Sequence, residues 1–522
     1  MQNTQDKNQK WWLVSVCATW LFLLTQIIPR QIADPDLWGR LSVPALFFQN
    51  NLVFPYTDPF SFTFLNQPWI DHEWLSGFVF YGAMLVFGEA GLSILKYALI
   101  GATVWLLFQL HRVVYQRSPL YALYGIILSS PVLAFGYYTT LRCQSFSFLF
   151  FTLSLFTLEL VRLHQKPEVL RALVALLLVW SWLHGGFALG IILLGLYLIG
   201  HWVEQCKLSL TPYAKPLIFA LLGIGFMNPY GPEYMEFIAQ AISMTRLHVG
   251  EWAPLPLWNF EYIETKLLIV LTLFLLVRAK KITTPTLVLL FAILITLKAI
   301  RMQPFLVLAF IAYLPLLWEE AKLIRPSRFY NTFAKTGPVL IGIACAAVLG
   351  QLHTVQPLFS TVVPSQNDIL AELNYPVGAI NYLQASQLSG NLMTPFPVGE
   401  FTYWNLYPKF KISLDGRFEE VYSVEHYKNQ YRFYKLPMPN AVDYAEQLNA
   451  NFILANQGFA NRELFENSPH WQIVYTDFSF VIFAHKNTLA HKPVIATPPS
   501  KNSYTIGDFF TAADRARFKS QS

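Results

Sequence analysis

The sequence predicts a mainly α-helical, polytopic membrane protein that carries a small α/β domain at its C-terminal end. Three observations lead to this fold class. Of the 522 residues, 54% are hydrophobic and only 13% are charged, whereas soluble proteins average about 25% charged residues. Apolar segments near the ~20 residues that cross a bilayer recur along the first two thirds of the chain. From about residue 352 the composition becomes that of an ordinary soluble domain.

Eleven apolar segments are expected to be membrane-spanning helices. The first is too long for the apolar region of a signal peptide and lacks a small-x-small cleavage site, so we expect it to be retained. The segments lie at residues 11–29, 90–110, 119–138, 145–161, 170–183, 186–203, 216–228, 265–278, 284–300, 304–318 and 337–351.

The distribution of Lys and Arg predicts the orientation of these helices. Cytoplasmic segments of membrane proteins are rich in both residues, and every second connecting segment is basic here if the N-terminus is cytoplasmic. This orientation places the C-terminal domain on the opposite side. The basic segments contain Lys7 and Lys10; Arg112 and Arg117; Arg162, Lys166 and Arg171; Lys207 and Lys215; Arg278, Lys280 and Lys281; and Lys322, Arg325, Arg328 and Lys335.

One apolar stretch, at residues 73–88, would reverse every later segment if it crossed the membrane. We therefore expect a helix at 74–88 that lies at the outer interface or re-enters the membrane. It belongs to a first outer loop at residues 30–89. The predicted transmembrane domain then comprises residues 1–351.

The C-terminal domain, residues 352–486, is predicted to be α/β because strand and helix patterns alternate along it. A Pro/Ser/Thr/Lys-rich tail at 487–522 is expected to be loosely ordered. The expected strands lie at 391–396, 410–416, 451–456, 471–477 and 478–485, and the expected helices at 374–384, 424–434 and 441–449.

Polar side chains of the predicted membrane domain gather at one level, the outer ends of the helices. Ionisable groups near membrane depth are costly and are therefore functional candidates. Carboxylates and basic groups at one level are expected of a cavity that binds an anionic head group. They are Asp34, Asp36, Asp71, His72 and Glu73 in the first outer loop, and Arg142, His184, Asn228, Tyr230, Glu251, Arg301 and Gln303 at later helix ends.

Each of these residues also has a purely structural interpretation. The two aspartates beside Pro35 and the segments at 228–231 and 415–417 are typical of turns. The two arginines can reach lipid phosphates at the interface, and His184, which precedes two glycines, can be a hydrogen-bonded loop residue. The shared level, rather than any single residue, supports a binding site.

Composition and cysteine spacing argue against two classes of function. The net charge is +6, and the sequence contains no dense run of Lys or Arg. It therefore lacks the basic patch that binds nucleic acid. The four cysteines contain no CxxC pair, so neither a disulfide framework nor a cysteine metal site is supported. They are Cys17, Cys143, Cys206 and Cys345.

Several short motifs resemble those of the GT-C superfamily, whose members are multi-span glycosyltransferases that use polyprenyl-phosphate-linked sugars. The motifs are ADPDLW after the first span, HEWLSG, and LHG, NPYG and RxQP at later helix ends. A narrower resemblance is to a bacterial group of GT-C-like proteins whose periplasmic part carries YPxGAxxYL and a strand ending in DGR. These motifs stand here at 375–383 and 415–417, and the resemblance extends over about residues 10–485.

The resemblance implies a bacterial inner-membrane glycosyltransferase with a catalytic carboxylate in its first outer loop and a periplasmic C-terminal domain. The matching residue is Asp36, with Asp34 as its neighbour and with Glu73 and His72 as further candidates. The sequence has Asp-Pro-Asp in place of the adjacent Asp-Glu of protein mannosyltransferases, and it lacks the WWD motif of oligosaccharyltransferases. The identities of sugar and acceptor therefore do not carry over, and the acceptor can be a glycan, a lipid or a protein.

The residue types fit this chemistry. If residues 34–36 are extended, Asp34 and Asp36 point to the same side, and their proximity raises one of their pKa values, as a base requires. Arg142 and Arg301 suit the donor phosphate because a planar guanidinium makes two charge-assisted hydrogen bonds. The two aspartates can instead hold a divalent cation, although we favour a site without metal. The further candidates for binding the donor are His184, Asn228, Tyr230 and Gln303.

Two other functions stay open at this point. The first is a non-catalytic role in envelope-glycan transport or assembly, as a flippase or a scaffold, because a fold does not fix a function. The second is an O-antigen polymerase or ligase, which also uses a lipid-linked donor. A flippase is expected to show inverted repeats and broken helices, and the sequence shows neither pattern.

Overall fold

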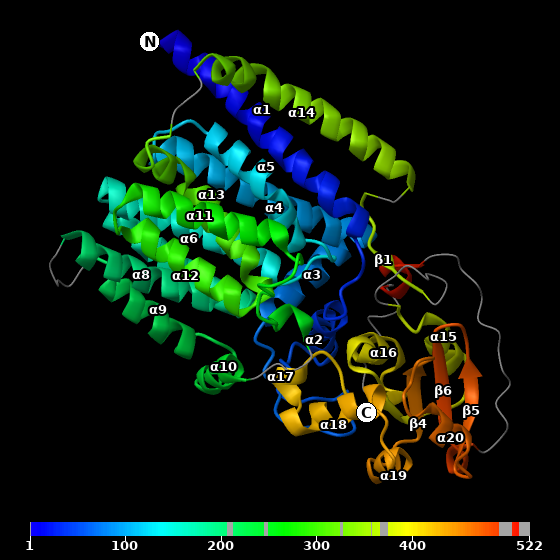
Figure 1. Ribbon diagram of the computed structural model, residues 1–522. Helices are drawn as coiled ribbons and strands as arrows, with labels where there is room; N and C mark the ends of the chain where they lie inside the picture. Colours follow the sequence, from blue (N-terminus) through cyan, green and yellow to red (C-terminus); the bar gives the residue numbers. More distant parts are fainter. Residues whose placement is uncertain are drawn as a thin grey trace. The chain divides into compact units, whose positions relative to one another are not determined.

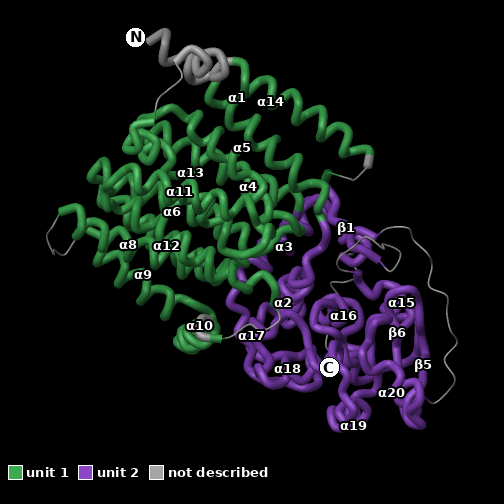
Figure 2. Tube along the Cα trace, viewed as in Figure 1, with its two compact units in different colours: residues 1–31, 93–358 green, residues 32–92, 359–522 purple. Residues whose placement is uncertain are grey.

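The computed structural model describes residues 2–205, 212–244, 249–323, 327–355, 358–365, 374–489 and 504–510. The chain forms two compact units, shown in different colours in Figure 2. Unit 1 consists of residues 1–31 and 93–358, and unit 2 consists of residues 32–92 and 359–522.

Unit 2 is discontinuous in the sequence because the first connecting loop packs with the C-terminal segment. We expected residues 30–89 to belong to the membrane domain, whereas residues 32–92 share a unit with residues 359–522. Backbone bridges join the two segments, from Ile32 to Val362 and from Ser61 to Ile412. Side chains that are far apart in the sequence can therefore meet within unit 2.

Unit 1 is built from α-helices. Each of the eleven predicted apolar segments contains a helix, so their helical character is confirmed. These eleven helices are α1 (Gln2–Ile27), α4 (Gly91–Gln109), α5 (Leu120–Phe135), α6 (Gln144–His164), α7 (Leu170–Leu183), α8 (Phe187–Gln205), α9 (Ala214–Phe226), α11 (Ile263–Ala279), α12 (Thr284–Lys298), α13 (Gln303–Glu320) and α14 (Ser327–Val355). Unit 1 also contains α10 (Glu233–Ser243).

The protein is an integral membrane protein. Six helical segments of the described chain are long and apolar enough to cross a membrane, and three shorter apolar helices accompany them. The six are Trp11–Arg30, Trp74–Val114, Gln144–His164, Phe187–Gln205, Ile300–Glu320 and Thr336–Thr354, and the shorter three are Leu120–Phe135, Ala214–Phe226 and Thr284–Lys298. The number of true spans and their orientation stay predictions.

Helix α13 forms the core of unit 1. It contacts α5, α6, α11 and α12. Of the apolar, membrane-length segment that contains α13, 83% is buried, whereas only 17% of the corresponding segment of α14 is buried. A helix that is apolar on all sides is stable when other helices surround it. Helix α14 instead packs alongside α1 (Figure 1), which leaves most of its apolar surface for lipid.

The predicted helix at 74–88 is present as α3 (Trp74–Phe87), and it ends at Gly88, whose φ is +61°. Its 14 residues extend about 21 Å, which is short of the ~30 Å hydrocarbon core. A short 3₁₀ turn, α4 and a π-helical turn, Leu110–Val114, continue the apolar stretch. Its expected interfacial position stays a prediction. Helix α3 packs on α2 (Leu37–Gln49), which the sequence analysis did not anticipate.

Unit 2 contains a five-stranded mixed sheet with the strand order β3-β2-β4-β6-β5. All five predicted strands are confirmed. They are β2 (Gly390–Met393), β3 (Phe410–Ile412), β4 (Phe452–Asn456), β5 (Trp471–Thr476) and β6 (Phe480–His485). Strand β2 pairs in parallel with β3 and β4, whereas β6 pairs antiparallel with β4 and β5.

Helices of unit 2 pack against this sheet around an aromatic core that includes Phe433, Phe465, Trp471 and Phe483. The three helices predicted in this region are confirmed as α15, α18 and α19. The helices are α15 (Val377–Ala385), α16 (Gly399–Leu406), α17 (Phe418–Val421), α18 (Val424–Lys435), α19 (Ala441–Gln447) and α20 (Arg462–Glu466).

Most of the predicted loose tail lies outside the described residues. Residues 504–510, however, are ordered: β7 (Tyr504–Thr505) pairs antiparallel with β1 (Val362–Val363), and a 3₁₀ turn follows it. Phe509 is buried, and its carbonyl accepts a hydrogen bond of 2.9 Å from the Trp404 indole. This part of the tail therefore belongs to the packed structure of unit 2.

Candidate functional site

The two aspartates beside Pro35 lie in a turn just before α2. The backbone of Asp36 is helical, with φ −73° and ψ −11°, so residues 34–36 do not have the extended conformation that would point both aspartates to the same side. The N–H of Asp36 donates a hydrogen bond of 3.1 Å to the Asp34 carboxylate, which is buried. Asp34 thus makes a turn of the kind that Asx side chains favour. Proline favours this turn because its ring fixes φ near the helical value.

The carboxylate of Asp36 makes no capping hydrogen bond to α2, although Asp36 occupies the N-cap position. It is half-buried and lies near Glu400 of α16. A Cβ atom at Gly416 would stand 2.7 Å from Glu400 Oε1 and 3.0 Å from Asp36 Oδ1. The glycine of the Asp-Gly-Arg motif therefore leaves room for both carboxyl groups.

Glu400 is a buried carboxyl group of this site. Its Oε2 accepts a 2.7 Å hydrogen bond from the N–H of Gly39, where any Cβ would collide with the glutamate. Its Oε1 is buried and has no hydrogen-bond partner among the described residues. Burial, and then the negative charges of Asp36 and Asp415, raise the pKa of Glu400 well above its ordinary value. This arrangement favours the protonated form of Glu400.

Arg417 of the same motif holds two buried aspartates. Its guanidinium contacts Asp58 at 2.7 Å and Asp415 at 2.6 Å, and the three side chains are at most 1% exposed. It also lies over the rings of Phe60, Trp69 and Tyr403. The motif therefore does more than form a turn, because its arginine ties the first loop to the C-terminal segment.

A second buried network joins α2, the segment at 71–73 and α17. Arg40 contacts Asp71, Glu73 at 3.3 Å and Glu420 at 3.0 Å. His72 contacts Glu420 at 2.8 Å, and the Trp69 indole donates to the other oxygen of Glu420 at 2.9 Å. The predicted candidates His72 and Glu73 thus belong to an ion-pair network rather than to the group of carboxyls around Glu400.

The protonation states in this network follow from its contacts. Burial lowers the pKa of His72, but Glu73 and Glu420 outweigh it, so the net pKa rises to about 10. Burial raises the pKa of Glu420, but Arg40 and His72 outweigh it and the net value falls to about 2. For Asp71 burial prevails, and its pKa rises to about 6.

The nitrogen and oxygen atoms of Asp71, His72 and Glu420 lie within 4.8 Å of one another, as metal ligands do. A metal ion here would have to displace Arg40 from two of these side chains and a proton from His72. Arg40 and His72 therefore already supply the positive charge that these carboxylates need.

In unit 1, two predicted arginines meet at one glutamate. Arg142, which precedes α6, contacts Glu251 at 2.9 Å, and Arg301, which precedes α13, contacts it at 3.1 Å. The guanidinium of Arg301 also lies 4.3 Å above the ring of Trp252. Glu251 and Trp252 belong to a 3₁₀ turn, Gly250–Trp252. These three charged side chains carry two positive charges and one negative charge.

The charge on Glu251 is strongly stabilised. Burial raises its pKa, but Arg301, Arg142 and also His184 outweigh burial, and the net pKa falls to about 2. His184 follows α7, contacts Ser147 at 2.7 Å and accepts a 2.8 Å hydrogen bond from the N–H of Gly186. The structure thus brings three predicted residues, Arg142, His184 and Arg301, into one electrostatic cluster.

The other predicted residues of unit 1 have local partners. The Asn228 side chain accepts a 3.0 Å hydrogen bond from the N–H of Tyr230, and Gly231 has a φ of +58°, so this segment is a turn. Gln303 accepts a hydrogen bond from Thr265 of α11. The turn supports the structural interpretation for Asn228.

Comparison with known proteins identifies the fold. No family model and no curated protein match the sequence. The apo crystal structure of the Archaeoglobus fulgidus oligosaccharyltransferase superposes with a TM-score of 0.56 and 9% identity, over 85% of this chain and 69% of that one. The chain has the GT-C fold. A second GT-C structure, archaeal oligosaccharyltransferase AglB from Archaeoglobus fulgidus in complex with an inhibitory peptide and a dolichol-phosphate, gives a TM-score of 0.51 and 11% identity, over 95% of this chain and 76% of that one.

Sequence reasoning missed Glu400, Arg40 and Glu420. A signal was available for two of them, because Arg40 and Glu400 are the lone charges of apolar stretches, LWGRLSVPALFF and PFPVGEFTYW. A lone charge in such a stretch needs a buried partner. Neither partner lies nearby in the sequence, so the spacing of motifs could not reveal them.

Proposed function

We propose that this protein is a membrane glycosyltransferase that moves a sugar from a polyprenyl-phosphate donor to an acceptor hydroxyl. The observation that carries the proposal is the pair of carboxyl groups Asp36 and Glu400 over Gly416, within a GT-C fold. The dolichol-phosphate in the complex of the archaeal enzyme of the same fold supports a lipid-phosphate donor.

In the proposed reaction Asp36 is the general base. The acceptor hydroxyl attacks the anomeric carbon of the donor sugar and passes its proton to Asp36. The bond between the anomeric carbon and the phosphate oxygen breaks, and the polyprenyl phosphate leaves with the electron pair. A positioned base contributes roughly 10²–10⁴-fold to such a step. The N-terminus of α2 favours the ionised form of Asp36 because the helix dipole is positive there.

Glu400 supports this assignment through its proton. Three carboxyl groups, Asp36, Glu400 and Asp415, lie together here. Asp415 is paired with Arg417, so Glu400, whose pKa is raised well above its ordinary value, is the one that we expect to take up a proton. A neutral Glu400 does not repel a negative charge on Asp36. Asp34 is secondary in the proposal, because its carboxylate already accepts a hydrogen bond from the turn.

The proposal assigns Arg142 and Arg301 to the phosphate of the donor. Their contacts with Glu251 leave a positive excess among these three side chains, and guanidinium groups bind phosphate in a two-pronged geometry. We assign no metal to this reaction, because the arginines can neutralise the leaving phosphate.

The proposed location is the bacterial inner membrane, with the N-terminus in the cytoplasm and residues 359–522 in the periplasm. Alkaline phosphatase is active only after export, so a fusion after Ser360 should be active and one after Lys280 inactive. The opposite pattern would overturn this orientation.

The function is tested in a deletion strain that carries either the wild-type protein or Asp36→Asn. Mass spectrometry of lipids and glycans should show that the deletion strain accumulates a polyprenyl-phosphate sugar and lacks a glycosylated product. Wild type should restore the product, whereas Asp36→Asn should not, although the variant is made and inserted. Asp443→Asn, a change at an exposed aspartate of α19, is the matched control. Full restoration by Asp36→Asn contradicts the proposed base.

A further inference from the structure

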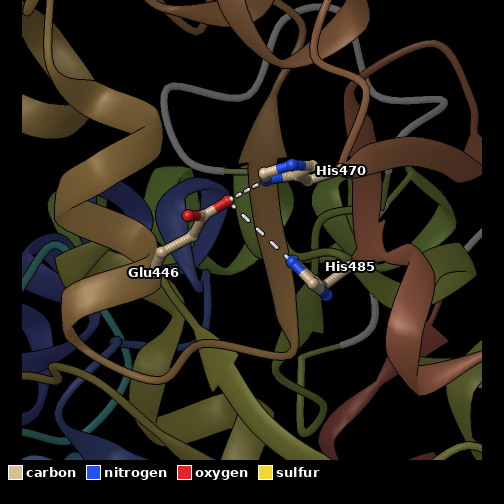
Figure 3. Close-up of side chains that lie close together, drawn as sticks. All are labelled: Glu446, His470 and His485. Atoms are coloured by element: carbon tan, nitrogen blue, oxygen red, sulfur yellow. Dashed lines mark hydrogen bonds and ion pairs between the residues drawn. The ribbon is translucent and has the colours of Figure 1, made fainter.

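Three potential metal ligands meet at the edge of the sheet in unit 2, and they share no residue with the site proposed above. Glu446 lies at the end of α19, His470 directly precedes β5, and His485 ends β6. Figure 3 shows both imidazole rings directed at the same carboxylate. Oε1 of Glu446 lies 2.9 Å from Nδ1 of His470 and 3.9 Å from Nε2 of His485. The three ligand atoms all lie within 4.8 Å of one another.

The backbone around these side chains is fixed by the sheet. Strands β5 and β6 are antiparallel, and Trp471 pairs with His485. The N–H of Lys486 donates to the carbonyl of His470 at 2.8 Å, and the N–H of His485 donates to the carbonyl of Asn451 at 2.9 Å. The ring of His485 packs edge-on against Trp471 at 5.2 Å. Both histidines are therefore presented by rigid elements, as a metal site requires.

Helix α19 holds Glu446 in the same rigid frame. Ala441 and Ala445 of this helix are fully buried in the aromatic core of unit 2. Glu446, next to Ala445, is consequently anchored on the surface above the strand ends. Its side chain is 34% exposed and that of His470 is 59% exposed, so an ion in solution can reach the cluster.

We propose that Glu446, His470 and His485 bind a divalent transition-metal ion of the Zn²⁺ class. Two imidazoles and one carboxylate form a common ligand set for zinc with a fourth position open. Zinc bonds of 2.0–2.2 Å place tetrahedral ligand atoms about 3.3 Å apart, between the two distances seen here. Mg²⁺ and Ca²⁺ prefer oxygen ligands, so this set selects against them.

A hydrogen bond explains only half of the arrangement. The contact between Glu446 and His470 has hydrogen-bond length, but 3.9 Å to His485 is too long for one. A metal ion between the three atoms makes bonds to all of them. When Nε2 of His485 binds the metal ion, the ring proton must lie on Nδ1. Nδ1 can then no longer accept the long hydrogen bond of 3.4 Å from the N–H of Asn487. This cost is small, so we expect micromolar affinity.

The bound ion would connect α19 to the ends of β5 and β6, and it would leave one position for water or for a ligand from a partner. Because binding to the folded state alone stabilises a protein, Zn²⁺ should raise the thermal midpoint of unit 2. This effect is independent of the proposed sugar transfer.

The test uses the full-length protein, purified in detergent, freed of metal with EDTA and desalted. Titration calorimetry with ZnCl₂ should show one ion bound per chain, and the ion should raise the unfolding midpoint. His470→Asn, His485→Asn and Glu446→Gln should each weaken binding by at least about tenfold and abolish the shift in midpoint. His470 is exposed, so His470→Asn should leave the midpoint without metal unchanged.

Two controls make the result specific. His353→Asn changes an exposed histidine of α14 and should bind Zn²⁺ as wild type does. His72→Asn removes the histidine of the other described His–carboxylate cluster and should also retain the ion. The proposal is overturned if wild type binds no Zn²⁺ at micromolar concentration, or if the three cluster variants bind it as wild type does.

Discussion

Both units contain arginine–carboxylate clusters, but the clusters differ in burial and in charge balance. In unit 2, Arg417 and its two aspartates are at most 1% exposed, and carboxylates outnumber the arginine. In unit 1, Arg142 and Glu251 are 26% and 27% exposed, and arginines outnumber the carboxylate. A fully enclosed cluster offers no access to a ligand, whereas a partly exposed cluster with excess positive charge can exchange its internal partner for an anionic ligand.

The largest expected effect distinguishes the two clusters by stability. Arg417→Met leaves Asp58 and Asp415 buried without their cation, which should cost about 3–5 kcal/mol of unfolding free energy. Thermal unfolding of the detergent-purified protein should show a large fall in the midpoint. Arg462→Met, which breaks the exposed pair with Glu466, is the control and should cost about 1 kcal/mol or less. Equal midpoints for the two variants would mean that burial does not set the cost of losing an arginine from an ion pair.

The next effect concerns ligand binding by the cluster in unit 1. Arg301→Ala removes charge-assisted hydrogen bonds worth about 1.5–3 kcal/mol, so undecaprenyl phosphate should bind about ten- to a hundredfold more weakly. Arg301→Lys keeps the charge but loses the fork and the stacking on Trp252, so it should fall between Ala and wild type. Native mass spectrometry of the purified protein measures the affinities. If Arg301→Ala binds undecaprenyl phosphate as tightly as wild type does, Arg301 only anchors the helix end at the membrane interface.

The pH dependence of stability should reflect the second network of unit 2. The folded pKa of His72 is raised from 6.5 to about 10. Its stabilisation is therefore complete below pH 6.5 and is lost as the pH rises through 10. Between pH 7 and 10 the thermal midpoint of wild type should fall more steeply than that of His72→Asn. Parallel curves would show that His72 is neutral in the folded protein.

The smallest expected effect tests whether Glu251 competes with the ligand. Glu251→Gln removes the negative charge that Arg142 and Arg301 share. Undecaprenyl phosphate should then bind about two- to fivefold more tightly, because an exposed pair contributes ~1 kcal/mol or less. A weaker affinity would instead show that the glutamate positions the arginines.

The sequence predicted the helices of unit 1 and the strands of unit 2 because both carry local patterns. Apolar length identifies a helix such as α13, and a run such as FSFVIFAH identifies β6. Helix α2 escaped prediction because Arg40 and Pro44 interrupt its apolar pattern. The ordered residues at 504–510 escaped for another reason, since a Pro/Ser-rich context hides a segment that is held by tertiary packing alone.

The candidate site was predictable only in part. Arg142, His184 and Arg301 share a helix-end position, from which the sequence analysis expected them at one level, and the structure pairs Arg142 and Arg301 with the same glutamate. Glu400 could not be placed, because its neighbours Asp36 and Gly39 lie more than 350 residues earlier in the chain. The sequence also left the conformation at Asp36 open, and the turn at Pro35 gives it a helical backbone.

The discontinuous make-up of unit 2 has a consequence for how the protein is made. Arg40 and Glu420 are 380 residues apart, and ribosomes add about 5–20 residues per second, so Arg40 waits roughly 20–80 s for this partner. During that interval Arg40 has Asp71 and Glu73 as partners. Asp58, whose cation is Arg417, must stay hydrated or be shielded by a chaperone, since burial without that partner is unfavourable. The first loop thus reaches its native conformation only after the last third of the chain has been synthesised. A ribosome that stops before residue 400 should release a chain whose membrane helices are inserted but whose first loop is open to proteases.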